Sequence, residues 1–298
     1  MGGANPRRVV IFKYSNDEEK FKVNYDTLLL DSPFLAHRSF ALHNRLTTST
    51  GIDATLIHNF IRSLGPLKRK FPDAEMKFAW ESYGTVQWRR ELYPSYKPPK
   101  FVNDGYKEQV RDLQRLLSNL GYKLYYANGN EADDTIASLC DSSTGNVCIF
   151  TVDKDLMQLV NNSVHVYNGK ELFTERDVFE KFGVYPLQIP DLLAIWGDTA
   201  DNIEGLPGFG FKKSVEVIEK YQRIESIPKE HPLSKSMDKL ILNKKLTTLN
   251  RSCHIISYVP QPFVPISSII SKYELKQVGE HIEDYRSNYN EQRQTTFI

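Results

Sequence analysis

Three carboxylates fall within four positions at residues 131 to 134, where the chain reads EADD. Like charges held this close raise the free energy of the folded protein unless a cation lies among them. Glu131 and Asp134 are three residues apart, so they share one face of a helical turn, and Asp133 lies beside them. The motif therefore predicts a bound cation.

Further carboxylates follow short apolar runs that are typical of buried strands. Asp31 and Glu81 each end such a run, and Asp153 and Asp155 follow a third, two residues apart in an extended segment. Ligands of open parallel sheets bind outside the carboxyl ends of the strands. We therefore expect these acids to converge with the EADD motif at one edge of a sheet.

Asp198 and Asp201 add a last pair, three residues apart at the end of a predicted helix. The full set of expected metal ligands is Asp31, Glu81, Glu131, Asp133, Asp134, Asp153, Asp155, Asp198 and Asp201. Such oxygen ligands favour Mg²⁺, with Mn²⁺ as a substitute, and the absence of histidine and cysteine from these motifs argues against zinc. Two ions of this kind can activate a water and stabilise the leaving oxygen of a phosphodiester.

Each acid also has a simpler interpretation when it is taken alone. Asp31 could be a helix N-cap, Asp133 and Asp134 could favour a helix N-terminus, and Asp153 could form a turn. Their joint position after successive strands favours the metal site.

The elements between these acids alternate in type. We expect strands at 25–31, 75–81, 123–127 and 146–152, and helices at 51–71, 107–122 and 132–140. This order predicts an α/β fold with a mainly parallel central sheet flanked by helices.

Residues 83 to 111 form an insert that is too long for an ordinary connection. It contains six basic residues, which are Arg89, Arg90, Lys97, Lys100, Lys107 and Arg111, interleaved with aromatic residues that include Tyr96. Aromatic faces for bases and cations for phosphates are typical of single-strand binding. The alternative is a pair of surface helices with amphipathic aromatic residues.

A glycine-rich turn at 205–214 precedes a predicted helix. Gly205, Gly208 and Gly210 allow close approach of the backbone to a phosphate, and Lys212 and Lys213 add charge at the helix N-terminus. The segment is either a plain turn or, after the acidic residues before it, a helix–hairpin–helix that binds a duplex backbone without reading sequence.

The composition of the whole chain fits a large core without a membrane span. The chain has 298 residues, 40% of them hydrophobic, and a formal net charge of +1. No apolar run is long enough for a transmembrane helix, and the charged N-terminus does not resemble a signal peptide. The three cysteines lack zinc-like or paired spacing, which indicates reduced thiols and a cytoplasmic location. The polar C-terminus predicts a frayed or partner-facing tail.

Five segments, in this order, resemble motifs of the 5′ nuclease superfamily: LLLDSPFLAHRSF, WRRELYPSYKPP, NEADDTIASL, FTVDKDLMQLV and WGDTADNIEGLPGFGFKKS. This group includes the 5′-exonuclease domain of bacterial DNA polymerase I, the flap endonucleases and the stand-alone bacteriophage 5′ nucleases. The stand-alone phage type is the most similar form, which would place the protein in a host cytoplasm.

The resemblance implies a PIN-like 5′ nuclease fold with a helical arch and a three-helix form of the helix–hairpin–helix, which also holds K⁺. The implied organisation is an N-terminal extension at 1–24, a nuclease core at 25–183 with the arch at about 83–111, a DNA-binding subdomain at 184–259 and a tail at 260–298.

The resemblance also implies roles for single residues. Asp31, Glu131 and Asp133 resemble ligands of the first metal. The ligands of the second metal are resembled by Asp153, Asp155, Asp198 and Asp201. Asp133 or Asp134 would lie near both metals. Lys97 resembles the arch lysine at the scissile phosphate, and Arg89 resembles the basic residue at the base of the arch. The family has Asp where this chain has Glu81, so Glu81 is the departure from the pattern.

The sequence therefore predicts a Mg²⁺-dependent nuclease that removes the 5′ end of DNA as a 5′→3′ exonuclease and a flap endonuclease, with Lys97 and Arg89 stabilising phosphoryl charge. Its expected partners are branched, flapped, duplex and single-stranded DNA, with RNA–DNA primers as a further substrate, and we expect a monomer without membrane contact. The alternatives are a related ribonuclease that removes RNA primers, and a non-catalytic protein that binds DNA structures.

Overall fold

The computed structural model describes residues 23–82, 87–98, 104–260 and 264–276. It confirms the predicted α/β fold, with a seven-stranded sheet in the order β6–β5–β4–β1–β2–β3–β9. The strands are β1 (Thr27–Asp31), β2 (Glu75–Ala79), β3 (Lys123–Tyr126), β4 (Val147–Phe150), β5 (Val164–Tyr167), β6 (Leu172–Phe173) and β9 (Ile256–Ser257). The five strands β1 to β5 run parallel to one another, while β6 is antiparallel to β5 and β9 is antiparallel to β3.

The central strand β1 shows why the sheet forms. It pairs with β2 on one side and with β4 on the other, and its three leucines are fully buried. A strand that is covered on both faces reads as a continuous apolar run, as TLLLD does here. Its side chains alternate between the faces, because Leu28 and Leu30 belong to one hydrophobic cluster and Leu29 to the other.

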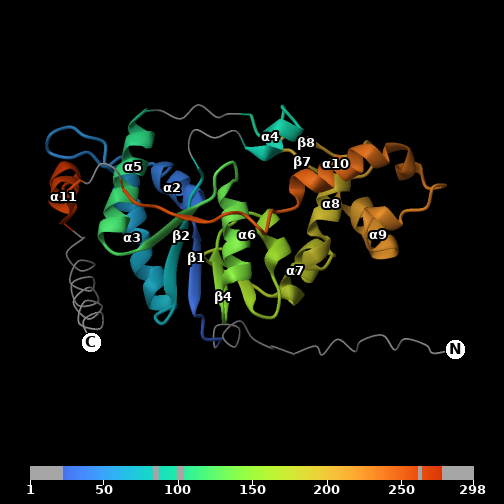
Figure 1. Cartoon of the computed structure of the whole chain (residues 1–298), viewed down its shortest axis with the longest axis horizontal. Coiled ribbons are helices and arrows are strands. Elements are labelled where there is room, and N and C mark those ends of the chain that lie inside the picture. The colour runs from blue at the N-terminus through green and yellow to red at the C-terminus, as the bar shows by residue number, and fades with distance from the viewer. Residues whose placement is uncertain (1–22, 83–86, 99–103, 261–263, 277–298) are drawn as a thin grey trace.

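Helices cover both faces of the sheet (Figure 1). The cluster with Leu28 and Leu30 draws on α2 (Ser32–Phe40), α3 (Thr55–Lys70), α5 (Asp104–Asn119) and α11 (Ile266–Tyr273). The cluster with Leu29 draws on α6 (Ala132–Ser142), α7 (Glu175–Phe182), α8 (Ile189–Trp196), α9 (Phe211–Tyr221) and α10 (Met237–Thr247). The second core therefore continues from the sheet into the C-terminal helices without a break.

Short elements complete the chain. They are α4 (Trp88–Leu92), the hairpin strands β7 (Gly197–Asp198) and β8 (Ile203–Glu204), and the 3₁₀ helices η1 (Asp155–Leu159), η2 (Pro186–Gln188), η3 (Ile224–Ser226) and η4 (Pro232–Ser236). None of the described helices combines the length and apolar character that a membrane span requires.

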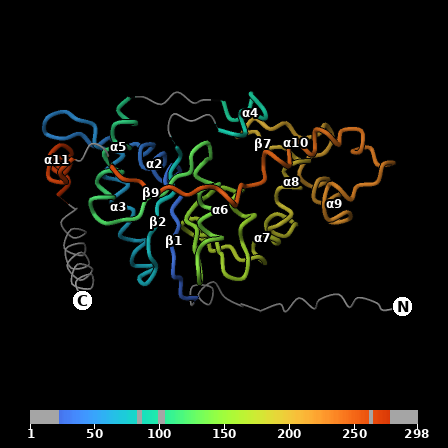
Figure 2. Tube along the Cα trace, viewed as in Figure 1, coloured from blue at the N-terminus to red at the C-terminus, as the bar shows by residue number. Residues whose placement is uncertain are grey.

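The chain after α10 runs back across the molecule to β9 and α11 (Figure 2). There β9 pairs with β3, and the buried side chains of Ile269 and Tyr273 join the core against α3 and α5. Residues 264–276 thus pack on the nuclease core through an apolar helix face, whereas the polar end at 283–298, where we predicted a frayed or partner-facing tail, lies outside the described residues.

Candidate metal centre

The acids predicted at the ends of the strands meet at one edge of the sheet. Asp31 is the last residue of β1, and its Oδ2 accepts a hydrogen bond of 2.7 Å from Thr151 Oγ1, just beyond β4. Its Oδ1 accepts the backbone N–H of Phe34 at 3.1 Å and so caps α2. The structure therefore confirms the N-cap interpretation of Asp31, and its role as a metal ligand stays a prediction. Thr151 was not predicted, although its place directly before VDKD was a signal.

A first group of carboxylates consists of Asp31, Asp133 and Asp153. Burial, together with the neighbouring charges of Asp153 and Glu81, raises the pKa of Asp31 to about 6. Burial and the charges of Asp153 and Asp31 also raise the pKa of Asp133 well above its ordinary value. No ion pair joins these three carboxylates to any lysine or arginine that the structure describes. Their mutual repulsion is what a divalent cation would relieve.

A second group consists of Asp155, Asp198 and Asp201, whose carboxylate oxygens lie within 4.8 Å of one another. Asp155 begins η1, Asp198 lies on β7 and Asp201 follows in the hairpin loop. The Oδ1 atom of Asp155 is buried without a hydrogen-bond partner among the described residues. Burial and the charge of Asp153 raise the pKa of Asp155 well above its ordinary value, so the charge of Asp153 links the two groups.

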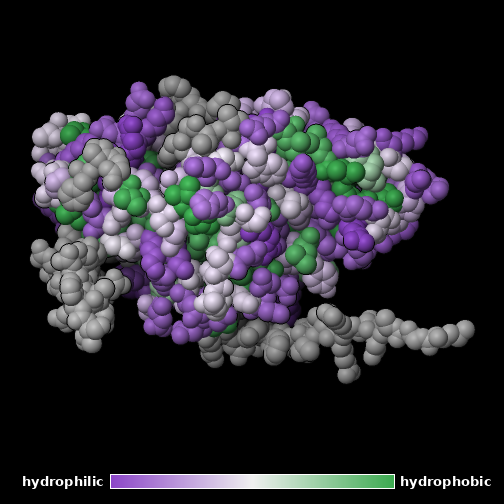
Figure 3. Space-filling view, in the orientation of Figure 1, coloured by the Kyte–Doolittle hydropathy of each residue, from purple (hydrophilic) through white to green (hydrophobic). Residues whose placement is uncertain are grey.

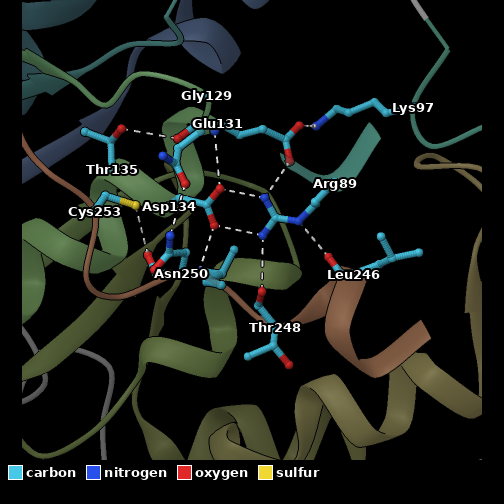
Figure 4. A network of polar contacts seen from close by, with 12 residues as sticks. Arg89, Lys97, Gly129, Glu131, Asp134, Thr135, Leu246, Thr248, Asn250 and Cys253 are labelled. Carbon is cyan, nitrogen blue, oxygen red and sulfur yellow. Dashed lines mark hydrogen bonds and ion pairs between the residues drawn. The ribbon is translucent and has the colours of Figure 1, made fainter. Parts of the chain in front are cut away.

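Lys97 lies between Glu131 and Asp201. Its Nζ is 2.8 Å from Glu131 Oε1 (Figure 4) and also lies 3.7 Å from Asp201 Oδ1. The backbone is held as well, because the N–H of Lys97 donates to the carbonyl of Asp201 and its own carbonyl accepts from Arg90 Nη2 at 2.7 Å. Burial opposes ionisation of Glu131, but Lys97 and Arg89 hold its pKa below the ordinary value. The structure thus brings Lys97 to the carboxylates, with Arg90 behind it.

Arg89 differs from the prediction. Its side chain is buried, and all five N–H groups have partners within the protein (Figure 4). Nη1 donates to Asp134 Oδ2 at 2.5 Å and to Glu131 Oε2 at 3.1 Å, and Nη2 donates to Asp134 Oδ1 at 2.8 Å. The remaining bonds reach the carbonyls of Leu246 and Thr248 at the end of α10. No donor is left for a phosphoryl oxygen, so in this structure Arg89 joins α4 to α6 and α10 instead.

Asp134 also differs from the prediction, because its carboxylate oxygens are already bonded within the protein. Besides Arg89, it accepts the backbone N–H of Asn250 at 2.8 Å and that of Glu131 at 3.2 Å, which completes a capping box at the start of α6. The side chain is fully buried and its oxygens are satisfied. The structure therefore gives it the role of a helix cap and ion-pair partner and leaves it outside both carboxylate groups.

Tyr96 was predicted to stack on DNA, but only 2% of its surface is exposed. Its ring packs with Ile203 and Leu246, and its hydroxyl lies 2.8 Å from Glu131 Oε2 and 2.9 Å from Asp201 Oδ2. The structure thus makes Tyr96 a positioning residue for two carboxylates and offers no face to a base.

Glu81 is half-buried just beyond β2. Burial raises its pKa, and its charged neighbours are Lys97, Glu131 and Arg90. It therefore lies near Lys97 and does not belong to the second carboxylate group of Asp155, Asp198 and Asp201. Lys100 lies outside the described residues.

The predicted glycine turn follows the β7–β8 hairpin. A Cβ atom on Gly205 would come within 2.0 Å of the carbonyl oxygen of Trp196, so the close approach requires glycine. Gly208 adopts a positive φ of 80°, and Gly210 is the N-cap of α9. Lys212 and Lys213 are exposed in the first turn of α9. The turn therefore places two cations beside an open helix N-terminus.

Comparisons with known proteins agree with this geometry. A family model described as 5'-3' exonuclease, N-terminal resolvase-like domain, matches residues 26–183, and one described as 5'-3' exonuclease, C-terminal SAM fold, matches residues 184–262. A 5'-3' exonuclease of Aquifex aeolicus is 36% identical, over 74% of this chain and 80% of that protein. DNA polymerase I of Pseudomonas aeruginosa is 35% identical over 64% of this chain, but only 22% of the polymerase is covered.

Among solved structures, the D15 protein of bacteriophage T5 co-crystallised with metal ions has a TM-score of 0.64 at 18% identity, with 88% of this chain and 98% of that chain covered. This likeness shows a shared fold. Together with the matched family models and the identity to the Aquifex protein, it establishes that the chain belongs to the 5'-3' exonuclease family.

Proposed function

We propose that the chain is a Mg²⁺-dependent 5′ nuclease that hydrolyses DNA phosphodiesters at two metal ions, with 5′→3′ exonuclease and flap endonuclease activity in replication or repair. The observation that carries this proposal is the presence of two carboxylate groups at one sheet edge, with pKa values of buried aspartates raised in each. A fold that keeps such repulsion in its core is suited to bind divalent cations there.

The donor set fits Mg²⁺ or Mn²⁺. Both groups offer carboxylate oxygens, and within the described residues no histidine or cysteine belongs to the set of three around Asp155. Asp31, Asp133 and Asp153 would hold one ion, and Asp155, Asp198 and Asp201 the other, with Glu131 held in place by Tyr96 and Lys97. When bound, such a pair of ions supplies an activated water and stabilises the leaving oxygen.

Lys97 is the residue of this centre that would contact the phosphate. Its ammonium is partly exposed, with 31% of the side chain accessible, and it already lies beside Glu131. In the substrate complex it would turn toward a phosphoryl oxygen, while the hydrogen bond from Arg90 to its carbonyl holds the backbone. A charge fixed in advance in this way stabilises charge that develops during the reaction.

Branched, flapped and duplex DNA are the proposed substrates. The exposed lysines of α9 would contact the backbone of the duplex, and K⁺ would be an additional ion at the hairpin. A bacteriophage T5 D15 flap endonuclease with the same fold has been solved in a complex with DNA and metal ions, which supports this substrate class. We further propose that the protein acts as a monomer in the cytoplasm, where RNA–DNA primers would be an additional substrate.

The test uses a 5′-labelled flap duplex with Mg²⁺ and with EDTA. The native protein is expected to cut near the junction only with Mg²⁺, and Asp155→Asn is expected to lose at least about a hundredfold in rate. Glu180→Gln serves as the matched control, because this carboxylate lies on α7 and forms an exposed ion pair with Arg176.

Tight binding of the flap without cleavage by the native protein would contradict the catalytic proposal and support a DNA-structure-binding protein. Cleavage of an RNA flap but not of the DNA flap would instead identify a ribonuclease. Cleavage of both in EDTA would contradict the metal dependence.

A further inference from the structure

Lys154 lies between Asp153 and Asp155 in the chain and extends its ammonium into the second carboxylate group. Its Nζ is 2.6 Å from Asp198 Oδ2 and 3.8 Å from Asp155 Oδ1. It therefore supplies part of the positive charge that these carboxylates require. Lys154 was not predicted, although its place between two aspartates in DKD was a signal.

The first group has no equivalent. Within the described segments, neither Asp31, Asp133 nor Asp153 forms an ion pair with a lysine or arginine. The two groups thus differ in a way that affects an entering ion. A cation that enters the first group displaces no ion pair of its three carboxylates, although the charge of Lys97 acts on Asp133, whereas in the second group it meets an ammonium that is already bound to Asp198.

Lys154 also has room to leave. About 29% of its side chain is exposed, and it borders a cavity of about 250 Å³ that is also lined by Asp198, Gly197, Thr199 and Asn202. The bond to Asp198 is an ion pair at the end of a flexible stem, which solvent can replace. The lysine can therefore move without a change in the packing of the core.

We propose that Lys154 is a built-in competitor of the divalent ion at Asp155, Asp198 and Asp201. Because the ammonium and the ion repel each other, the lysine must leave when the ion enters, and this group binds its ion more weakly than the first and fills last. The inference rests on the proposed metal-dependent function and assigns to Lys154 a part of the difference between the two sites, since the more distant Lys97 also pairs with Asp201.

The test measures Mn²⁺ binding to the full chain without DNA, by electron paramagnetic resonance of the free ion. The native protein is expected to show a tighter and a weaker class of sites. Lys154→Met should strengthen the weaker class about tenfold and leave the tighter class unchanged, because it removes the charge and keeps the length of the stem. Lys154→Arg should remain near native, and Lys170→Met, an exposed lysine away from the centre, should have no effect.

A second readout separates competition from a purely structural ion pair. Thermal unfolding of Lys154→Met is expected to show a loss of stability in EDTA and a larger stabilisation by Mn²⁺ than the native chain shows. An equal loss in EDTA and in Mn²⁺ would overturn the proposal, as would an unchanged or weaker Mn²⁺ affinity. If the native protein cleaves its flap with Mn²⁺ in that case, the proposed function stands and only the role of Lys154 fails. If the native protein binds no Mn²⁺, both fail.

Discussion

The guanidinium of Arg89 connects three parts of the chain that are far apart in sequence. It pairs with Asp134 at the start of α6 and with the last carbonyls of α10, so it supplies donors to carbonyls that a helix end leaves unsatisfied. Removal of one partner of such a buried ion pair is costly, because the other partner is then left in the core without a counter-charge.

We expect Arg89→Met to lower the free energy of unfolding by about 3–5 kcal/mol, since it leaves Asp134 buried and unpaired. Urea denaturation measures this loss. Arg111→Met, an exposed arginine of α5, is the control and should change stability by less than about 0.5 kcal/mol. Addition of Asp134→Asn to Arg89→Met should recover part of the loss, and a cost below about 1 kcal/mol for the single variant would show that Asp134 is not dependent on Arg89.

His165 of β5 provides a pH-dependent contribution to stability. Its Nδ1 lies 2.7 Å from the hydroxyl of Tyr25, and burial lowers its pKa, although the charge of Asp177 opposes this shift. Because the pKa is lower in the folded than in the unfolded chain, protonation favours unfolding. The stability that the neutral His165 contributes is therefore fully present above the pKa of about 6.5 in the unfolded chain. It is lost as the pH falls below that pKa and through the lower pKa of the folded chain.

We expect the native protein to lose more stability than His165→Gln between pH 7.5 and pH 5.5. The difference in slope is at most about 1.4 kcal/mol per pH unit, since one proton is involved. Urea denaturation of both proteins across this range tests the expectation, and the comparison cancels the opposite contribution of Asp31. Parallel stability curves would show that His165 does not titrate differently in the folded chain.

At the residue scale, the sequence was informative about which carboxylates meet, because strand ends and helical spacing place them. It could not show that Asp134 faces Arg89 instead of the metal groups. That depends on the side-chain direction of a residue 45 positions earlier in the chain. The burial of Tyr96 was hidden for the same reason, since its partners Glu131 and Asp201 come from distant elements.

The β7–β8 hairpin is the element that joins the metal centre to the turn before α9. It carries Asp198, and its end at Gly205 packs directly on the carbonyl of Trp196. The sequence predicted a helix end followed by a glycine turn here. Strands of two residues are too short to show the alternation of apolar and polar side chains that marks a strand in a sequence.

We expect Gly205→Ala to disturb this hairpin, because the added Cβ would lie 2.0 Å from a backbone oxygen. The variant should lose about 2–4 kcal/mol of stability and bind duplex DNA more weakly. Thermal unfolding and a binding titration with a blunt duplex measure the two effects. Gly210→Ala is the matched control for stability, since a Cβ there meets no atom within 4 Å. An equal loss of stability in both variants would contradict the steric argument.

Helix α11, the last described helix of the chain, is bonded to α3 and α5. The hydroxyl of Tyr273 donates to Asp112 Oδ2 at 2.9 Å, and its carbonyl accepts from His58 Nε2 at 2.8 Å. Lys272 adds ion pairs to Asp112 and Glu108 of α5. This contact could not be predicted from the sequence, because the helix is only eight residues long. Its apolar face can be recognised only from its packing against α3 and α5.

We expect Tyr273→Ala to cost about 3–5 kcal/mol of stability, since it removes a side chain that is 1% exposed. Tyr273→Phe, which keeps the ring, should cost only about 0.5–1.5 kcal/mol, because it removes one hydrogen bond while Asp112 Oδ2 keeps its bond of 2.6 Å to Lys272 Nζ. Chemical denaturation gives both values. Cleavage at a temperature where each variant is folded should remain native, because α11 is remote from the carboxylates. A loss of activity in the folded variant would mean that this helix also shapes the centre.

The surface of the described chain is mainly hydrophilic in the view of Figure 3, with small hydrophobic patches toward the end formed by α8, α9 and α10. Within the described residues, exposed large hydrophobic side chains at this end include Trp196 and Ile241. Single exposed hydrophobic side chains of this kind are ordinary on a folded protein.

The outer strands of the sheet have a consequence for the behaviour of the protein in concentrated solution. A parallel sheet that ends in a long open strand offers backbone groups to other chains and favours aggregation. Here β6 and β9 each contain only two residues and run antiparallel to their neighbours, so they cover β5 and β3 with short ends. The return of the chain to β9 thus also protects the sheet from pairing with a second molecule, and shortening the chain before this strand would expose β3 as a template for fibrous association.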